Sequence, residues 1–135
     1  AIPHLRSAGG GSIVFVGTML TRKPLPTMGA YASSKGALLT MAATLAAELG
    51  PANIRVNTVV PGWMDGPSLR EWFGRAAERA GTTAEHEYDV AARRAALGRL
   101  PTSMDCAQAV LFFASDMSAA ITGQTLDVNA GEVFA

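Results

Sequence analysis

Three short apolar runs have the pattern of strands that are buried on both faces. Residues 12–16 read Ser-Ile-Val-Phe-Val, residues 53–60 are rich in Ile, Val and Thr, and residues 124–128 read Gln-Thr-Leu-Asp-Val. The first run does not alternate between apolar and polar residues, which is typical of strands in a parallel sheet covered on both sides. Gly17 and the Pro61-Gly62 turn end the first two runs. We therefore predict three parallel strands.

A long helix is predicted between the first two strands. Residues 29–49 are rich in Ala, Leu and Met, and apolar side chains recur there at intervals of three and four residues, which indicates an amphipathic helix. These side chains are Leu38, Met41, Ala42, Leu45 and Leu49. Gly50 is expected to take the left-handed conformation that ends many helices, and Pro51 is expected to stop the helix there.

Three further helices are predicted before the last strand. Two cover about 68–80 and 84–97, and the third begins at Ser103, its expected N-cap, and ends near Ala114. Strands alternating with helices indicate an α/β fold, here part of a Rossmann-like doubly wound parallel sheet. Such sheets hold more than three strands, so the first strand is expected at an open edge. The chain is therefore expected to be a fragment of one domain.

Composition excludes several classes of partner. The 11 basic and 11 acidic residues cancel, so no nucleic-acid surface is expected, and no apolar run is long enough to predict a membrane span. Cys106 is the only cysteine, so no internal disulfide can form, and a buried, inert thiol is expected. His4 and His86 lack ligand-spaced neighbours, which argues against a metal site. A cytoplasmic location is expected.

One spacing points to proton chemistry. Tyr31 and Lys35 lie four residues apart, so their side chains leave one face of the predicted helix. A free phenol has a pKa of about 10, and a nearby cation stabilises its phenolate, which suits general acid/base catalysis. Alone, the pair also fits an ordinary surface Tyr and Lys. However, Thr18 and the Pro61-Gly62 turn follow two strand ends, the edge where α/β sheets bind ligands.

Ordered motifs along the chain resemble one family. They lie at residues 11–18, 31–38, 54–62, 98–102, 109–116 and 121–131. The first three resemble, in order, the catalytic Ser strand, the active-site helix and the following strand with its Pro-Gly turn in the short-chain dehydrogenase/reductases of the Tyr-x-x-x-Lys type. The last three are similar to that family's C-terminal end. The resemblance implies that residues 1–135 are the C-terminal catalytic half of a Rossmann-type domain.

The resemblance also implies an activity and a set of roles. The implied enzyme is an NAD(P)-dependent oxidoreductase that interconverts a secondary alcohol and a ketone. Tyr31 would exchange a proton with the substrate oxygen, Lys35 would bind the nicotinamide ribose, and Thr18, in place of the family's Ser, would bind the substrate oxygen. Residues implied to contact the nicotinamide are Tyr31, Lys35, Pro61, Gly62 and Met64. The choice between NAD and NADP depends on a residue outside this sequence.

Residues 63–97 correspond to the family's variable substrate lid. Aromatic and aliphatic side chains there predict an apolar pocket for an alcohol or ketone, although they could simply pack the lid. The predicted substrate-binding residues are Thr18, Met19, Trp63, Leu69 and Trp72. Arg70, Arg75 and Arg79 follow an exposed helix face, so no recognition of phosphate or carboxylate is expected.

The resemblance also implies a quaternary structure, and two rival functions stay open. The helix over residues 29–49 packs against its symmetry mate in the family, which implies a homodimer or homotetramer. The family's Gly-rich phosphate turn is absent from the sequence, so the fragment alone is expected to be inactive. A sensor that binds cofactor without turnover, and a truncated chain without activity, remain open alternatives.

Overall fold

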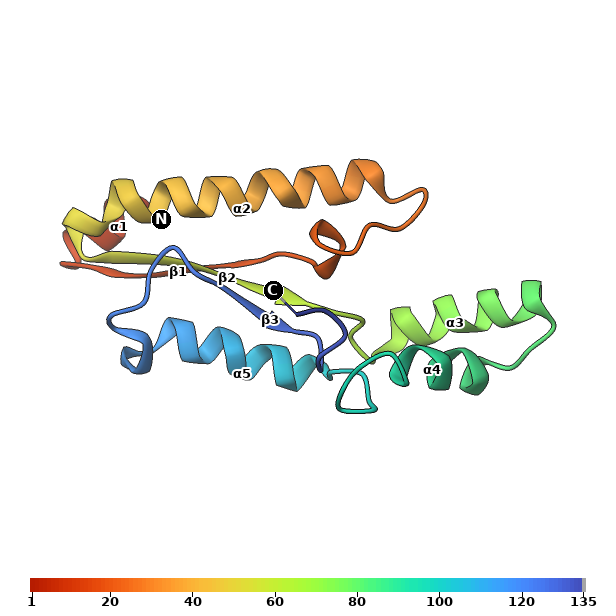
Figure 1. Cartoon of the computed structure of the whole chain (residues 1–135). Coiled ribbons are helices and arrows are strands. Elements are labelled where there is room, and N and C mark those ends of the chain that lie inside the picture. Colours follow the sequence, from red (N-terminus) through yellow and green to blue (C-terminus); the bar gives the residue numbers. More distant parts are fainter. Residues whose placement is uncertain (135) are drawn as a thin grey trace.

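Helices cover both faces of a parallel sheet in the computed structural model, which describes residues 1–134. Figure 1 shows α2 on one face and α5 on the other, with the α3–α4 hairpin beyond the end of the sheet. The strands are β1 (Gly11–Val16), β2 (Ile54–Pro61) and β3 (Thr125–Val128), and the helices are α1 (Ile2–Ser7), α2 (Gly29–Leu49), α3 (Pro67–Ala80), α4 (Ala84–Ala92) and α5 (Ser103–Ala114). The predicted α/β class is confirmed.

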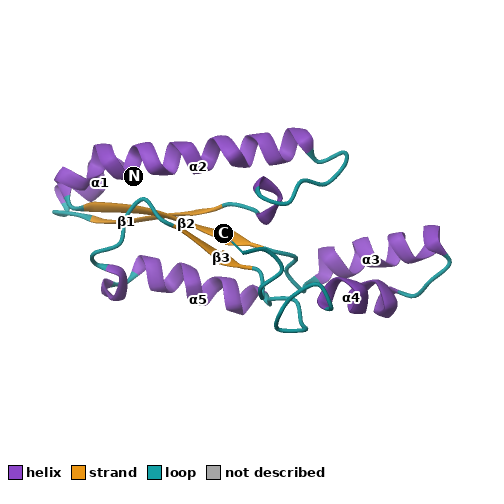
Figure 2. Cartoon of the chain, in the orientation of Figure 1, coloured by secondary structure: helices purple, strands orange, loops and turns teal. Residues whose placement is uncertain are grey.

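β2 is the central strand and pairs in parallel with both neighbours. Gly11 lies opposite Ile54 in the β1 pair, and Pro61 lies opposite Val128 in the β3 pair. Because the strand order is β1-β2-β3, one edge of β1 has no neighbour among the described strands, as expected. The parallel arrangement brings the carboxyl ends of all three strands to the same edge, near the α3–α4 hairpin (Figure 2).

Three polar residues interrupt the apolar run of β2, and the side chains of two of them, Arg55 and Asn57, are bonded to the segment around α5 and β3. The Arg55 guanidinium donates to the Phe113 carbonyl at 2.9 Å and to Ser118 Oγ at 2.7 Å. The Asn57 amide donates to the Ile121 carbonyl at 2.9 Å, and its oxygen accepts from the Gln124 backbone N–H at 3.0 Å. Buried polar groups need such partners, so these bonds explain Arg55 and Asn57, whereas the buried Thr58 hydroxyl has no partner in residues 1–134.

α2 packs on the sheet through its small residues. Ala42, Ala46 and Leu49 are buried against Ile54 and Val56 of β2. The predicted helix range is therefore confirmed, but Met41 from the expected stripe is 45% exposed and does not belong to this core. The helix has apolar residues on more than one side, so the sheet covers only part of them.

The expected left-handed residue at the end of α2 is wrong. Gly50 has a helical φ of −52°, and a 3-10 turn over Gly50–Ala52 continues the chain. Pro51 fits this turn because proline's fixed φ suits the first turn of a helix. Asn53, with φ of 55°, takes the left-handed conformation instead, which Asn tolerates better than most residues.

Three other boundaries differ from the sequence prediction. α1 was not predicted, and the N-cap of α5 is Thr102 rather than Ser103. Hydrogen bonds from the Thr102 backbone and from Arg99 lower the pKa of Asp105, the partner of Thr102 in a capping box, to about 2. α4 ends at Ala92 because the backbone N–H groups after Arg93 no longer donate to the carbonyl four residues earlier. Those of Ala96 and Leu97 donate to carbonyls of the C-terminal segment.

Cys106 lies buried on α5, as predicted, and burial raises the pKa of its thiol. Within residues 1–134, no helix is long and apolar enough to cross a membrane. Across the same residues, no group of three or more His, Cys, Asp or Glu side chains is placed to hold a metal ion.

The α3–α4 hairpin has a small core of its own. Phe73 is 3% exposed and packs with Ala91, Ala92 and Leu100, and its ring meets the Tyr88 ring edge-on at 6.3 Å. This core fixes the position of α3 relative to α4. The hairpin can therefore present side chains at a defined place beyond the sheet edge.

Replacing Phe73 by Ala is expected to lower the free energy of unfolding by about 3 kcal/mol, because a buried aromatic ring leaves a cavity. Denaturant unfolding of the protein that contains this chain measures the change. Leu97→Ala is the control: this side chain is 66% exposed, so its loss should change stability by less than about 0.5 kcal/mol. Equal losses in the two variants would show that the hairpin lacks a core of its own.

Candidate active site

The loop that follows β1 places Thr18 at the sheet edge. Gly17 is buried, and a Cβ there would lie 3.2 Å from Val60 Cγ2, so the tight space favours glycine. Thr18 is extended and caps a 3-10 turn, its Oγ1 accepting from the Leu20 backbone N–H at 3.4 Å. As this bond uses the oxygen as acceptor, the hydroxyl hydrogen is left to donate.

Tyr31 and Lys35 lie on the first two turns of α2. Tyr31 is 45% exposed. The Lys35 ammonium donates at 2.9 Å to the carbonyl oxygen of Val16, the last residue of β1. This bond ties the start of α2 to the end of the strand that leads to Thr18. An ammonium has three donors, so the Val16 carbonyl leaves two for a ligand.

A cleft of about 820 Å³ opens at this edge of the sheet. It includes all five predicted substrate-binding residues and three of the predicted cofactor contacts. These residues are Thr18, Met19, Trp63, Leu69 and Trp72, together with Tyr31, Gly62 and Met64. Lys35 and Pro61 do not line the cleft. Lys35 lies beside it at the end of β1, and Pro61 is buried in β2.

Aromatic rings from the segment after β2 and from α3 form one side of the cleft, within the range predicted as the substrate lid. Trp63 follows β2 and stacks on Trp72 of α3, with ring centroids 5.3 Å apart and planes 28° apart. Trp72 in turn meets Phe73 of the hairpin core at 5.4 Å. These aromatic side chains therefore pack together and line the cleft at the same time, and their contact with a substrate stays a prediction.

Comparisons with known proteins agree with this geometry. Residues 1–132 match the sequence model of the family described as Enoyl-(Acyl carrier protein) reductase. The chain is 35% identical to Short-chain reductase protein NovJ of Streptomyces niveus, over 95% of this chain and 47% of that protein. It is 34% identical to 3-oxoacyl-(acyl-carrier-protein) reductase FabG of Thermotoga maritima, over 98% of this chain and 50% of that protein.

The chain belongs to the short-chain dehydrogenase/reductase family. Among solved structures, L-sorbose reductase from Gluconobacter frateurii, complexed with NADPH and L-sorbose, matches with a TM-score of 0.91 at 26% identity, over 99% of this chain and 51% of that one. The family resemblance read from the sequence motifs is thereby confirmed. The chain spans about half the length of the relatives it matches.

Two ion pairs hold in place the loop between Thr18 and Tyr31, which lines the cleft. The Lys23 ammonium lies 2.8 Å from the carboxylate of Glu132, a side chain only 1% exposed, and Arg22 pairs with Asp127 on β3. The loop between Thr18 and Tyr31 is therefore tied to the C-terminal segment. Neither pair was predicted from the sequence, because the partners lie more than a hundred residues apart and no spacing signal connects them.

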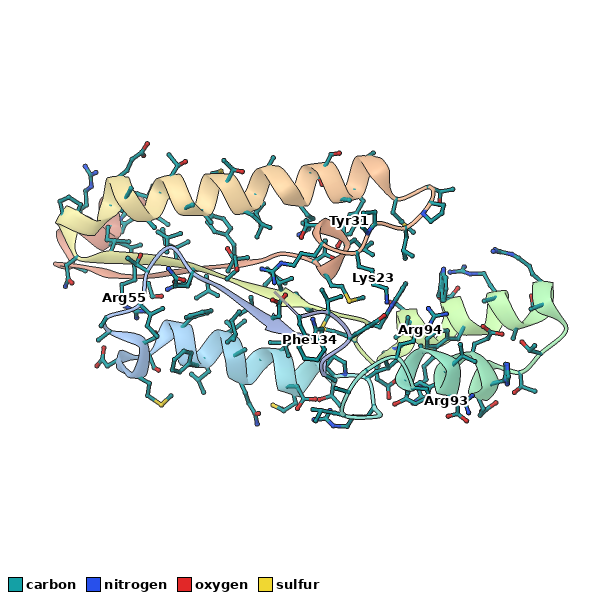
Figure 3. The ribbon with its side chains drawn as sticks, in the orientation of Figure 1. Lys23, Tyr31, Arg55, Arg93, Arg94 and Phe134 are labelled. Atoms are coloured by element: carbon teal, nitrogen blue, oxygen red, sulfur yellow. The ribbon has the colours of Figure 1, made fainter. Side chains whose placement is uncertain are left out.

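Two arginines of the lid also line the cleft. Arg79 is exposed, as the sequence analysis expected, but its face of α3 borders the cleft together with Arg94, which follows α4. Figure 3 labels Arg94 near the junction of the sheet and the hairpin. A signal for Arg79 did exist: it follows Trp72 by seven residues, and that spacing returns to the same helix face.

Proposed function

We propose that the protein containing this chain is an NAD(P)-dependent oxidoreductase that interconverts a secondary alcohol and a ketone. The observation that carries the proposal is the meeting of Thr18 and Tyr31 in one cleft, with the Lys35 ammonium bonded to the Val16 carbonyl at the end of β1. Family membership supports it, and the chain makes up about half the length of its relatives. The proposal thus concerns a protein that also has the dinucleotide-binding half.

The residues of the cleft divide the chemistry between them. When bound, the nicotinamide cofactor supplies the hydride or accepts it. Thr18 donates its hydroxyl hydrogen to the substrate oxygen and positions it. Tyr31 gives its proton to that oxygen as negative charge develops there, and in the reverse direction Tyr31 takes the proton back. Lys35 supplies the positive charge beside Tyr31 that stabilises the phenolate.

The residues present fit the nicotinamide end of the cofactor. The two unused donors of the Lys35 ammonium suit the hydroxyl pair of a ribose, because hydroxyl oxygens accept hydrogen bonds. Gly62 and Met64 lie in the cleft, where their backbone atoms can border a flat ring. L-sorbose reductase, complexed with NADPH, supports the assignment by its similarity. Either NAD or NADP is compatible with these residues.

The cleft favours a small molecule with an apolar body. Its lid side consists of Trp63, Trp72 and Leu69, and its opposite side includes Met19 and Leu25. Such apolar lining with few polar groups is typical of small-molecule sites. The hydroxyls of Thr18 and Tyr31 are then the groups that orient the reacting oxygen.

Replacing Thr18 by Val tests the proposal, with Thr18→Ser as the matched control. We expect Val to lower kcat for ketone reduction by about a hundredfold, because the donor to the substrate oxygen is lost. Ser keeps the hydroxyl and should keep the activity. Consumption of NAD(P)H with small apolar ketones measures both variants, and thermal unfolding checks that the 3-10 turn survives. Equal activity of the Val and Ser variants would contradict a role for the hydroxyl.

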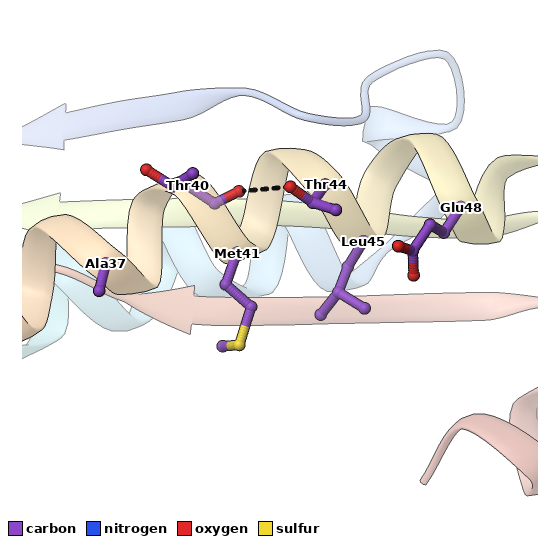
Figure 4. Close-up of a pocket in the computed structure, with 6 residues that line it drawn as sticks. All are labelled: Ala37, Thr40, Met41, Thr44, Leu45 and Glu48. Carbon is purple, nitrogen blue, oxygen red and sulfur yellow. Dashed lines mark hydrogen bonds between the residues drawn. The ribbon is translucent and has the colours of Figure 1, made fainter.

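A second copy of the chain is the partner we propose for the outer face of α2. A shallow groove runs along this face, lined by Ala37, Thr40, Met41, Thr44, Leu45 and Glu48 (Figure 4). The Thr44 hydroxyl is bonded to the Thr40 carbonyl, so it does not need a partner's group. Exposed apolar surface on a long helix supports the homo-oligomer implied by the family.

A further inference from the structure

The charges that line the cleft are all of one sign. Arg79 and Arg94 are lining residues, and no Asp or Glu is among the residues that line it in the described part of the chain. The chain as a whole has 11 basic and 11 acidic residues, so this local excess does not reflect its composition. The charged side chains that line the cleft beside its apolar walls are therefore positive.

Two neighbouring arginines of α3 are paired with carboxylates. Arg70 donates two hydrogen bonds to the Asp65 carboxylate, both at 2.8 Å, and Arg75 donates to Glu71 at 3.0 Å. Neither residue lines the cleft. Arg79 and Arg94, like Arg93 outside the cleft, form no ion pair with any residue in 1–134. Their guanidinium groups are available to a ligand.

The position of Arg79 sets where such a ligand group would lie. It follows Trp72 by seven residues on α3, which places its Cα about 10 Å further along the helix. α3 leads away from the sheet edge that holds Thr18 (Figure 1). A ligand whose oxygen reaches Tyr31 and whose body lies on Trp72 therefore has its far end toward Arg79.

We propose that the substrate carries an anionic oxygen group, a carboxylate or a phosphate, at the end remote from the reacting oxygen, that Arg79 binds this group, and that Arg94 adds positive charge to the same cleft. The inference rests on the proposed oxidoreductase function and narrows its substrate class to ketones with an apolar body and an acidic end. Guanidinium groups suit carboxylate and phosphate oxygens because their N–H donors form a planar fork. This proposal differs from the sequence-based expectation of an apolar substrate without recognition of phosphate or carboxylate.

Matched rigid ketones test the inference on the full-length protein. The probes are 4-acetylbenzoate, its neutral methyl ester and 4-acetylphenyl phosphate, and the measured quantity is kcat/KM for each with NAD(P)H. We expect one of the two anions to exceed the ester by about tenfold, the size expected for charges that remain partly exposed. The anion with the higher kcat/KM shows whether the site prefers a carboxylate or a phosphate. In the Arg79→Gln/Arg94→Gln double variant, the ratio of anion to ester should fall to about one.

Arg75→Gln and Arg93→Gln are the matched controls, because both remove an arginine of the hairpin region that does not line the cleft. Figure 3 labels Arg93 on the opposite side of the hairpin from Arg94. Both controls should keep the ratio found in the unchanged protein. A ratio of one in the unchanged protein, or a ratio that survives in the double variant, would overturn the inference while leaving the oxidoreductase proposal intact.

Equilibrium binding separates this inference from the proposed chemistry. The alcohols that correspond to the three probes are titrated into the Tyr31→Phe variant in the presence of NAD(P), where no turnover is needed. Tighter binding of an anionic alcohol, lost in the double variant, supports the charge recognition even if no ketone is reduced. Absence of both reduction and preferential binding overturns the inference together with the proposed function.

Discussion

Replacement of Tyr31 by Phe is expected to lower kcat about 10⁴-fold and to leave substrate binding nearly unchanged. The substitution removes one hydroxyl, the group proposed to carry the proton, and general acid/base catalysis contributes up to about this factor. The ring remains in place, so the wall of the cleft keeps its shape. Steady-state kinetics with NAD(P)H and a ketone give kcat, and titration of the alcohol product gives binding.

Tyr88→Phe is the matched control for this prediction, because the chain has only two tyrosines. Tyr88 packs in the hairpin against Phe73 and under Arg70, outside the cleft. Loss of its hydroxyl should leave kcat close to that of the unchanged protein. If Tyr31→Phe kept more than about a tenth of the activity, the proton would have to come from another group. A protein without turnover whose cofactor-dependent response survives Tyr31→Phe would instead fit the sensor alternative.

Local sequence patterns were sufficient for the fold where one physical signal dominated. The unbroken apolar run of β1 and the small residues of α2 predicted a buried parallel sheet and its crossover helix, and both are present. Boundaries failed where local rules competed with longer-range bonds. Gly50 was expected to be left-handed, but Asn53 takes that conformation, and α4 ends early because Ala96 and Leu97 bond to the C-terminal segment.

The candidate site was predictable to the extent that it depends on the strand ends. Thr18 and Tyr31 could be placed together because parallel strands end at one edge and the crossover helix begins there. The side chains that bond to this edge or border it could not be predicted. Lys23 and Glu132 meet across more than a hundred residues, and Arg94 reaches the cleft only through the folding of the hairpin.

The two sides of the cleft are supported differently. The side with Thr18 is tied to the sheet by the Lys35–Val16 bond and to the C-terminal segment by the Lys23–Glu132 pair. The lid side depends on the separate core around Phe73. We therefore expect substitutions on the sheet side to change the chemical step, and those on the lid side to change which ketone is accepted.

Replacement of Lys35 by Met is expected to lower kcat/KM about 10³-fold. Met keeps a flexible apolar side chain but removes the ammonium, and with it the positive charge beside Tyr31 and the donors proposed for the ribose. Loss of one preorganised charged donor costs about 10² to 10³ in rate, and weaker cofactor binding adds to this. Separate titrations should show a lower kcat and also a higher KM for NAD(P)H.

A merely structural role for Lys35 predicts a different result, because it would lower stability and leave the KM for NAD(P)H unchanged. The Lys35–Val16 bond lies in an exposed position, so its loss should move the unfolding temperature little. Lys35→Arg keeps the charge and should recover part of kcat, since the planar guanidinium replaces the ammonium imperfectly. Ser33→Ala, an exposed change on the same turn, should have no effect. If Lys35→Arg recovered kcat but not the KM for NAD(P)H, the positive charge would act on Tyr31. The geometry of the ammonium would then be needed to bind the ribose.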